Sequence, residues 1–341
     1  MSSANLMPSL FQRLAAAGVD RSFVTKVVLP FWWDEAMTSS QPGFAYTAVI
    51  VASRLGLDLK AVMNPSAALV APKAAGTRYK LNANVTTDDV VWARSIAVSA
   101  GRAAIWACKL PHVAIPVDPQ AIHREIKAAG QQCVTLTNLL DYLWAHGVPV
   151  IHVCKVPKKQ KRMVGLAAMV DGRPVIVLCK REKYSAQEVF VVAHEAGHVS
   201  RHLKNNAVIF DEKIDREYPE DNEEKEANDF AARVLTGSPG VYGAMPRYMT
   251  ASTLAKTAKE TGKRDGVDPG VVAMSYAHGK QFYPVGVGAC SVLEGPNACA
   301  TEIVLSKMRE QLDLEQISKE DRVFLLTATG LGEKNAVPVG Y

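Results

Sequence analysis

The stretch His194-Glu195-Ala196-Gly197-His198 is the part of this 341-residue chain that best indicates its fold and its chemistry. It has the form H-E-x-x-H. On a helix, two histidines at this spacing project from one face, so both imidazoles can reach one metal ion, and the intervening glutamate turns toward water bound on that ion. The stretch therefore predicts a zinc-dependent hydrolase. Two ordinary helix histidines are the alternative.

The flanking sequence predicts an amphipathic helix around this motif. A buried strand is expected over residues 175–178, and Ser185 and Glu188 have the spacing of a capping box, so the helix should begin at Ala186. From there, apolar residues recur at helical spacing at Val189, Val192, Ala193, Ala196 and Val199. This stripe would bury one side of the helix and leave the His194/His198 edge facing a cleft.

A third metal ligand is predicted from a second helical pattern. A catalytic zinc ion takes three protein ligands and keeps a fourth position for water. After an acidic stretch at 210–223, expected to be irregular, helical spacing resumes at Ala227, Phe230, Ala231 and Val234. Glu224 and Asn228 share one face of this helix, so Glu224 could bind the metal while Asn228 hydrogen-bonds a ligand side chain.

Three neighbouring side chains are harder to assign. Glu223 and Glu226 point elsewhere on the helical wheel and are predicted to form a solvated acidic face. His202 lies one turn beyond His198 on the same edge. It either shapes the site or assists proton transfer, or it is a partly exposed residue at a helix end.

The two motifs together resemble those of a known family. His194-Glu-Ala-Gly-His198 with His202 following, and then Glu224-x-x-Ala227-Asn228-x-Phe230-Ala231-Ala232, are similar to the ImmA/IrrE family of small bacterial and phage metallopeptidases. The resemblance covers residues 136–235, about a third of the chain. The chain departs from the family pattern where the second helix usually ends in Leu-Met-Pro and here continues Leu235-Thr-Gly-Ser-Pro239, so nothing is inferred about the following loop.

The resemblance implies a compact gluzincin-like domain with one zinc ion on His194, His198 and Glu224 and with Glu195 as the catalytic base. Family members cleave or control helix-turn-helix repressor proteins in phage, mobile-element, stress or toxin–antitoxin circuits.

Zinc lowers the pKa of its bound water to about 7, so Glu195 can accept a proton near neutral pH and return it to the leaving amine. A further donor to the oxyanion is expected, with Tyr218, Tyr248, Tyr276 and His278 as open candidates.

Composition indicates an ordinary globular protein, with 48% hydrophobic and 21% charged residues. Residues 1–20 lack the basic start and long apolar core of a signal peptide, and no segment approaches the roughly 20 apolar residues that span a membrane. The six cysteines include no C-x-x-C pair, which is typical of reduced thiols in a cytoplasmic protein. We therefore expect a cytoplasmic location and no membrane partner.

Charge does not by itself call for nucleic acid, because a net charge of +5 is modest at this length. A basic run at 155–162 lacks the interleaved aromatic residues that stack on bases, so a solvated loop is favoured there. Faint helix-turn-helix patterns occur at 10–29 and 251–278, where simple helical packing is the more frequent outcome. Direct nucleic-acid binding is left open.

The chain is predicted to be an α+β protein in three parts. Residues 1–118 form a helical N-terminal region of unknown role, 119–245 the zinc metallopeptidase domain, and 246–341 a mixed, mostly helical C-terminal region. Strands at 148–154, 164–170 and 175–178, the last two joined as a hairpin, predict a small mixed or antiparallel sheet packed on the H-E-x-x-H helix and the second ligand helix. The hairpin is the expected place for strand addition by a substrate.

Two functions account for these patterns. The first is a zinc endopeptidase that hydrolyses a peptide bond in a protein substrate, with a helix-turn-helix repressor or antitoxin-type regulator as the candidate. The alternative is a metal-bound regulatory or DNA-binding protein with little or no peptidase activity. A deformylase-like amidase is disfavoured, because it needs a cysteine ligand in a Gly-Cys-Leu context that neither Cys154 nor Cys179 provides.

Overall fold

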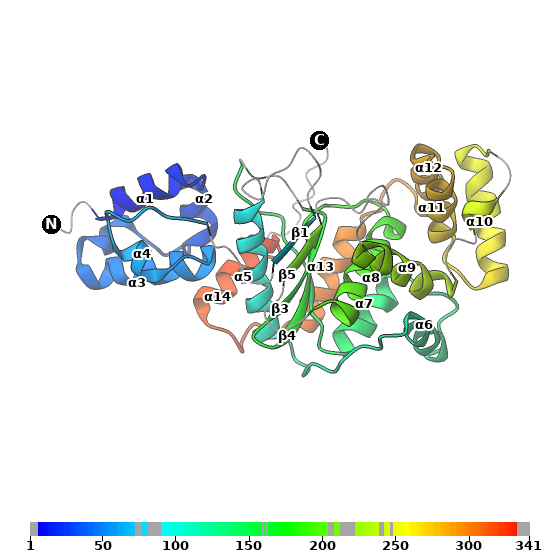
Figure 1. Ribbon diagram of the computed structural model, residues 1–341, viewed down its shortest axis with the longest axis horizontal. Coiled ribbons are helices and arrows are strands. Elements are labelled where there is room, and N and C mark those ends of the chain that lie inside the picture. The colour runs from blue at the N-terminus through cyan, green and yellow to red at the C-terminus, as the bar shows by residue number, and fades with distance from the viewer. Residues whose placement is uncertain are drawn as a thin grey trace.

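A computed structural model describes residues 6–71, 77–80, 90–158, 160, 163–203, 208–211, 222–238, 242–245 and 248–332. In these residues, helices surround one five-stranded sheet (Figure 1). The architecture is α+β, with helical regions on both sides of the sheet. The predicted fold class is therefore confirmed.

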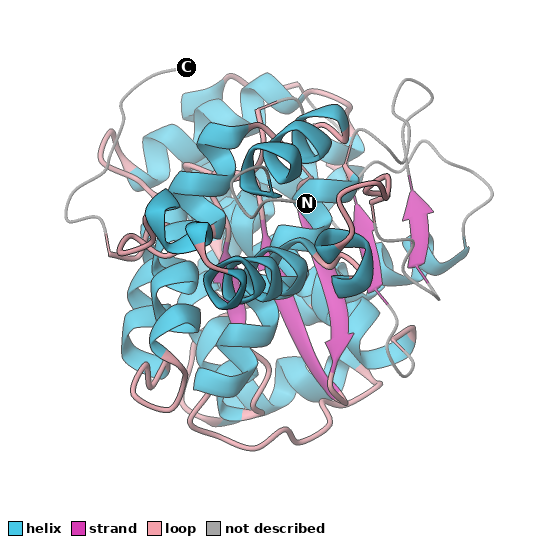
Figure 2. Cartoon of the chain, turned by 90° about the vertical axis from the view of Figure 1, so that its left-hand side faces the viewer, coloured by secondary structure: helices cyan, strands magenta, loops and turns pink. Residues whose placement is uncertain are grey.

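The sheet is mixed, and its strands follow the order β1-β5-β3-β4-β2. The strands are β1 (Thr77–Lys80), β2 (Val150–His152), β3 (Gly165–Val170), β4 (Arg173–Leu178) and β5 (Val208–Asp211). Strand β3 runs antiparallel to β4 and β5, whereas β2 is parallel to β4 and β1 is parallel to β5. Figure 2 shows the strands as a row among the helices, with the N-terminal helices in front of them.

The predicted hairpin is confirmed. Strands β3 and β4 are joined through Asp171 and Gly172, whose φ angles of 52° and 76° are both positive, as in the type I′ turn that matches the twist of a hairpin. Strand addition at this hairpin, however, is contradicted, because β3 already lies between β5 and β4, and β4 between β3 and β2. The edges of the described sheet are β1 and β2.

Two long helices cover opposite faces of the hairpin strands. Helix α5 (Val91–Ala107) packs Gly101 against the side chain of Val177 on β4, and α8 (Ser185–Arg201) carries Glu195 against Gly165 on β3. Gly165 pairs across the strands with Leu178, the residue after Val177. Because successive residues of a strand point to opposite faces, this register separates the α5 face from the α8 face. The sheet is therefore a middle layer that supports the motif helix.

The other helices of the central and C-terminal parts enclose α8 and the sheet. Helix α9 packs mainly against α8 and α6, so the second ligand helix rests on the motif helix. Helix α13 covers β2, α14 packs on α5, and α10, α11 and α12 form a cluster at the right of Figure 1. Their bounds are α6 (Pro119–Ala128), α7 (Leu136–Ala145), α9 (Asn222–Thr236), α10 (Ala251–Asp265), α11 (Pro269–Gly279), α12 (Tyr283–Glu294), α13 (Ala300–Gln311) and α14 (Lys319–Thr329).

The N-terminal helices form a group that is held by the C-terminal helix α14 (Figure 1). The guanidinium of Arg54 forms a 2.8 Å ion pair with Asp321 and lies 4.3 Å from the ring centroid of Phe324, both on α14. The indole of Trp92 on α5 donates to the carbonyl of Ala17 at 2.7 Å. This group contains α1 (Leu6–Ala16), α2 (Arg21–Phe23), a π-helical turn (Val24–Val28), a 3-10 helix (Glu35–Ser39), α3 (Gln41–Leu55) and α4 (Leu59–Met63).

Neither helix-turn-helix pattern produces a long exposed second helix in the described residues. In the first, α2 has three residues before the π-helical turn begins. In the second, α11 packs against α8, α10 and α12, and its Tyr276 is fully buried. Since a recognition helix must lie in the major groove of DNA, these segments are better described as packing elements. Separately, none of the described helices combines the length and apolar character needed to cross a membrane.

The start of α8 differs from the predicted capping box. The helix begins at Ser185, and Tyr184 at the cap position makes no side-chain cap. The backbone N–H and hydroxyl of Ser185 donate instead to the carboxylate of Glu294, at 3.0 and 2.9 Å. The predicted capping box was wrong because the carboxylate of Glu294 on α12 accepts the hydrogen bonds at the start of α8. A local sequence pattern does not reveal a partner on another helix.

Glu188 is a buried carboxyl group on α8 that takes no part in a cap. Its Oε1 atom has no hydrogen-bond partner among the described residues. Burial raises the pKa of Glu188 to about 8, and the charge of Glu182 adds to this rise while Lys180 opposes it. The ammonium of Lys180 lies 2.6 Å from Glu182. Glu188 is therefore largely protonated at neutral pH in the folded chain.

Replacing Glu188 by glutamine should stabilise the fold in mild alkali but not in mild acid. The folded pKa is about 8 and the ordinary value is 4.5, so the unfolded chain loses this proton first as pH rises between the two. Wild-type stability falls across that window by about 1.4 kcal/mol per pKa unit, which amounts to a few kcal/mol, and Glu188→Gln removes the dependence. Urea unfolding at about pH 5 and about pH 8.5 measures the difference. An equal effect at both pH values would contradict this account.

Candidate metal centre

A close approach of two helices brings the candidate ligands together. At Gly197 of α8, an added Cβ would lie 3.2 Å from three carbon atoms of Phe230 on α9. The guanidinium of Arg201, one turn later on α8, lies 5.2 Å from the centroid of the Phe230 ring. A larger residue at position 197 would push the helices apart, because protein interiors are close-packed. Glycine therefore lets α9 carry Glu224 to the histidine edge of α8.

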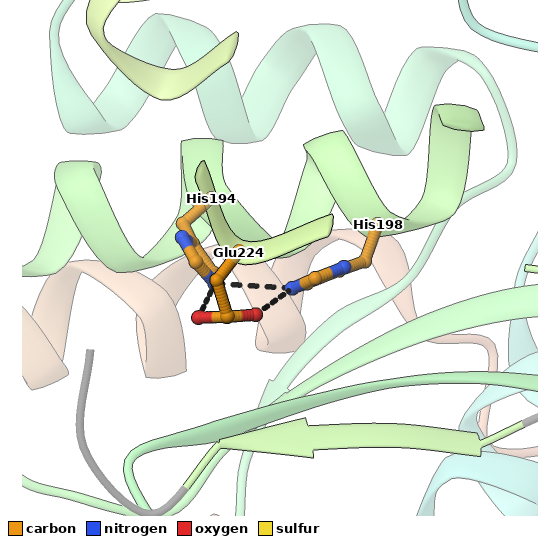
Figure 3. Close-up of side chains that lie close together, drawn as sticks. All are labelled: His194, His198 and Glu224. Carbon is orange, nitrogen blue, oxygen red and sulfur yellow. Dashed lines mark hydrogen bonds and ion pairs between the residues drawn. The ribbon is translucent and has the colours of Figure 1, made fainter. Parts of the chain in front are cut away.

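Three buried side chains converge at this edge (Figure 3). The Nε2 atoms of His194 and His198 are 3.1 Å apart. Glu224 places Oε1 3.0 Å from Nε2 of His198 and Oε2 3.5 Å from Nε2 of His194. The two histidines are fully buried and Glu224 is 8% exposed. Among the described residues, no other group of three His, Cys, Asp or Glu side chains has donor atoms close enough to share a metal ion.

The spacing of these atoms suits a tetrahedral ion. Ligand atoms about 2.0–2.1 Å from a tetrahedral zinc ion are about 3.3 Å from one another. The two Nε2 atoms are 3.1 Å apart, and each lies 3.0 or 3.5 Å from a different oxygen of the Glu224 carboxylate. Two imidazole nitrogens and a carboxylate that converge in a buried position also need a positive partner, since burial of an unpaired charge is costly. His194, His198 and Glu224 could therefore hold a divalent metal ion.

The Nδ1 atoms of His194 and His198 also have polar contacts. Nδ1 of His194 lies 3.2 Å from Oδ1 of Asn228, the contact that the shared helix face predicts. Nδ1 of His198 lies 2.9 Å from Nδ1 of His202, whose Nε2 lies 3.1 Å from Oε2 of Glu226. Bonds of this kind fix the orientation of metal-binding imidazoles.

The prediction that Glu226 belongs only to a solvated face is thus wrong. Its side chain is 54% exposed, but one oxygen reaches His202, which is buried at the end of α8. A helical wheel of the second helix cannot reveal this contact because the partner lies on another helix. Glu223 is partly exposed on the first turn of α9.

Glu195 lies fully buried between α8 and the sheet. An added Cβ at Gly165 would overlap Oε1 of Glu195 and lie 3.2 Å from its Cδ and 3.3 Å from its Cγ. Glycine at the first position of β3 therefore provides the space for the carboxylate. Sequence reasoning missed Gly165, although a glycine inside a strand pattern is a signal of close approach by another group.

The candidates for a further oxyanion donor lie in different surroundings. Tyr248 is 76% exposed and stacks edge-on against Phe282 at 6.3 Å. Tyr276 is fully buried in α11, and the His278 ring packs edge-on against Tyr283 at 6.0 Å. Tyr218 lies outside the described residues. These surroundings do not single out one of the four residues as the oxyanion donor.

The fold and the site define an α+β domain with an H-E-x-x-H helix and a candidate metal centre. Residues 146–262 match the family model of the IrrE N-terminal-like domain, Peptidase_M78. This segment, about a third of the chain, contains α8 and α9 with all the candidate metal residues, and the match confirms the resemblance to the ImmA/IrrE family. The chain therefore carries a domain of a metallopeptidase family. No curated protein and no solved structure matches the chain.

Loss of the Glu224 carboxylate should abolish tight binding of a divalent ion. Glu224→Gln removes one of three ligands, so we expect the affinity for Zn²⁺ to fall by more than about a hundredfold, beyond the effect typical of residues that only orient a ligand. Metal content after desalting and competition with a chromophoric chelator measure this. Glu223→Gln, the same change one residue earlier, should keep wild-type affinity. Equal Zn²⁺ binding by wild type and Glu224→Gln would remove Glu224 from the site.

A methyl group at Gly165 should destabilise the chain only while Glu195 is present. The three atoms nearest to an added Cβ all belong to Glu195. Overpacking of this kind costs about 1–3 kcal/mol. In a Glu195→Ala background the methyl group has room, so Gly165→Ala should then lower the free energy of unfolding much less. A double-mutant cycle in urea gives the coupling energy. Additive effects would show that Gly165 does not accommodate the carboxylate.

Proposed function

We propose that this chain is a zinc-dependent endopeptidase that hydrolyses a peptide bond in a protein substrate. The observation that carries the proposal is the convergence of His194, His198 and Glu224 at 3.0–3.5 Å. Glu224 comes from α9, and the two histidines lie on α8, the helix that also holds Glu195. The match of this segment to a metallopeptidase family supports it. Zinc is the ion that a buried site of two imidazoles and one carboxylate favours.

Each of these residues has a distinct role in the proposed reaction. His194, His198 and Glu224 hold the ion, which when bound supplies polarisation of the peptide carbonyl and activation of a water molecule. Glu195 accepts a proton from the attacking water and delivers it to the nitrogen of the leaving amine. Asn228 orients His194 through the 3.2 Å contact to Nδ1. Within this proposal, the substrate is a helix-turn-helix regulator of a stress or phage circuit.

A second candidate function rests on the burial of the site. His194, Glu195 and His198 are each 0% exposed, whereas an endopeptidase must admit an extended chain. A metal site enclosed to this degree suits a regulatory protein in which the ion stabilises the fold, as closed structural zinc sites do. This candidate predicts that partner or DNA binding survives the loss of Glu195.

Cleavage by wild type and by Glu195→Gln separates the two candidates. The substrate to test is the small helix-turn-helix protein encoded beside this gene, if one is present there. Wild type loaded with Zn²⁺ should cut it, a chelator should stop cutting, and Glu195→Gln should retain Zn²⁺ but cut about 10²–10⁴-fold more slowly, the range for loss of a general acid–base. Glu223→Gln serves as the matched control. If both proteins hold Zn²⁺ and neither cuts, binding of the partner and of DNA should be measured, as the second candidate requires.

A further inference from the structure

A chain of polar contacts leads from the candidate metal position to the protein surface. Nδ1 of His198 lies 2.9 Å from Nδ1 of His202, and Nε2 of His202 lies 3.1 Å from Oε2 of Glu226. The side chain of His202 is 5% exposed and that of Glu226 is 54% exposed. The contacts join the end of α8 to the second turn of α9, the two helices that supply all three candidate ligands.

With Nε2 of His198 bound to the metal, the contacts determine which ring nitrogen carries each proton. His198 uses Nε2 for the metal, so its proton must be on Nδ1 and is donated toward His202. Nδ1 of His202 must then be the acceptor, which places the proton of this neutral ring on Nε2. Nε2–H of His202 donates to the carboxylate of Glu226. Every donor in the chain therefore faces an acceptor.

Without an acceptor at Glu226, this order is no longer enforced. His202 could then carry its proton on Nδ1, where it would oppose the Nδ1–H of His198 across 2.9 Å. Two donors cannot share a hydrogen bond, so the hydrogen bond between His198 and His202 would be lost. A carboxylate accepts strongly from an imidazole N–H, because the bond is charge-assisted.

We propose that Glu226 is a positioning residue of the metal centre, which selects the tautomer of His202 that accepts from His198 and so aims Nε2 of His198 at the metal. The inference rests on the proposed metal site but not on peptidase activity. It gives the two histidine ligands different supports. His194 is oriented directly by the amide of Asn228, whereas His198 is oriented by a histidine–carboxylate pair.

Zn²⁺ affinity of the full chain tests the proposal. Glu226→Leu should weaken Zn²⁺ binding about tenfold, at the lower end of the 10–100-fold effect of residues that orient ligands, because Glu226 is half-exposed. Glu226→Gln keeps an acceptor oxygen and should restore most of the affinity. Asp229→Leu removes a carboxylate from the same helix that pairs with Arg233 at 2.7 Å, and should leave the affinity unchanged.

The tautomer of His202 gives a readout that a general loss of helix stability would not move. In ¹⁵N-detected NMR of the imidazoles, wild type should show His202 protonated on Nε2, and Glu226→Leu should show a mixture of both tautomers. In a His202→Leu background, Glu226→Leu should have no further effect on Zn²⁺ affinity, since the relay is already broken. This second background keeps the test valid should one variant fold poorly.

Three results would overturn the proposal. They are Zn²⁺ binding by Glu226→Leu within about twofold of wild type, equal losses in Glu226→Leu and Asp229→Leu, and a wild-type His202 protonated on Nδ1. Failure of the proposed peptidase function would look different. In that case Zn²⁺ binds, responds to Glu226 as expected, and no substrate is cut.

Discussion

The contact between Gly197 and Phe230 is the constraint on which the metal centre depends. Helix α8 supplies His194, His198 and Glu195, but the third candidate ligand comes from α9. Because residue 197 has no side chain, the Phe230 ring lies against the backbone of α8. The same approach brings Asn228 to His194 and Glu226 to His202. A side chain at 197 would press on Phe230 and displace α9, and with it Glu224, Asn228 and Glu226, relative to the histidines of α8.

The sheet imposes the second constraint, on Glu195. Strand β3 passes under α8 with its first residue, Gly165, against the carboxylate. The position of that strand is set by pairing with β4 and β5 on either side. Helix α5 supports the opposite face through Gly101. The sheet therefore positions the catalytic carboxylate of the proposed reaction, and α5 supports this sheet from its other face. Helix α5 precedes residue 146, so it lies outside the segment that matches the peptidase family.

The terminal regions contribute to the central layer as well as to their own helices. Strand β1 extends the sheet beyond β5, and α13 covers β2. Helix α5 covers one face of the hairpin strands, and α14 packs against α5. The ion pair between Arg54 and Asp321 joins the N-terminal helices to the C-terminal helix α14. The carboxylate of Glu294 completes the start of α8 from α12. The motif helix is thus fixed by segments that lie far from it in sequence.

Local patterns predicted the elements whose signals are local. The hairpin of β3 and β4 followed from two apolar runs joined through Asp171 and Gly172, and α8 and α9 followed from helical spacing. Helix α6 and strands β1 and β5 were missed. Both missed strands have four residues, and their pairing partners are distant in sequence, so neither carries a local signal of its place in the sheet.

The sequence by itself determined the chemistry of the candidate site, because the spacing of His194, Glu195 and His198 along one helix places their side chains regardless of what surrounds it. It also indicated Glu224 and Asn228, which share a face of a second helix. Only the tertiary structure decided that Glu226 meets His202, that Gly165 holds Glu195 and that Glu188 is buried and protonated. The physical reason is that contacts between elements depend on how close their backbones approach. That distance is set by the packing of the whole chain and not by periodicity within one segment.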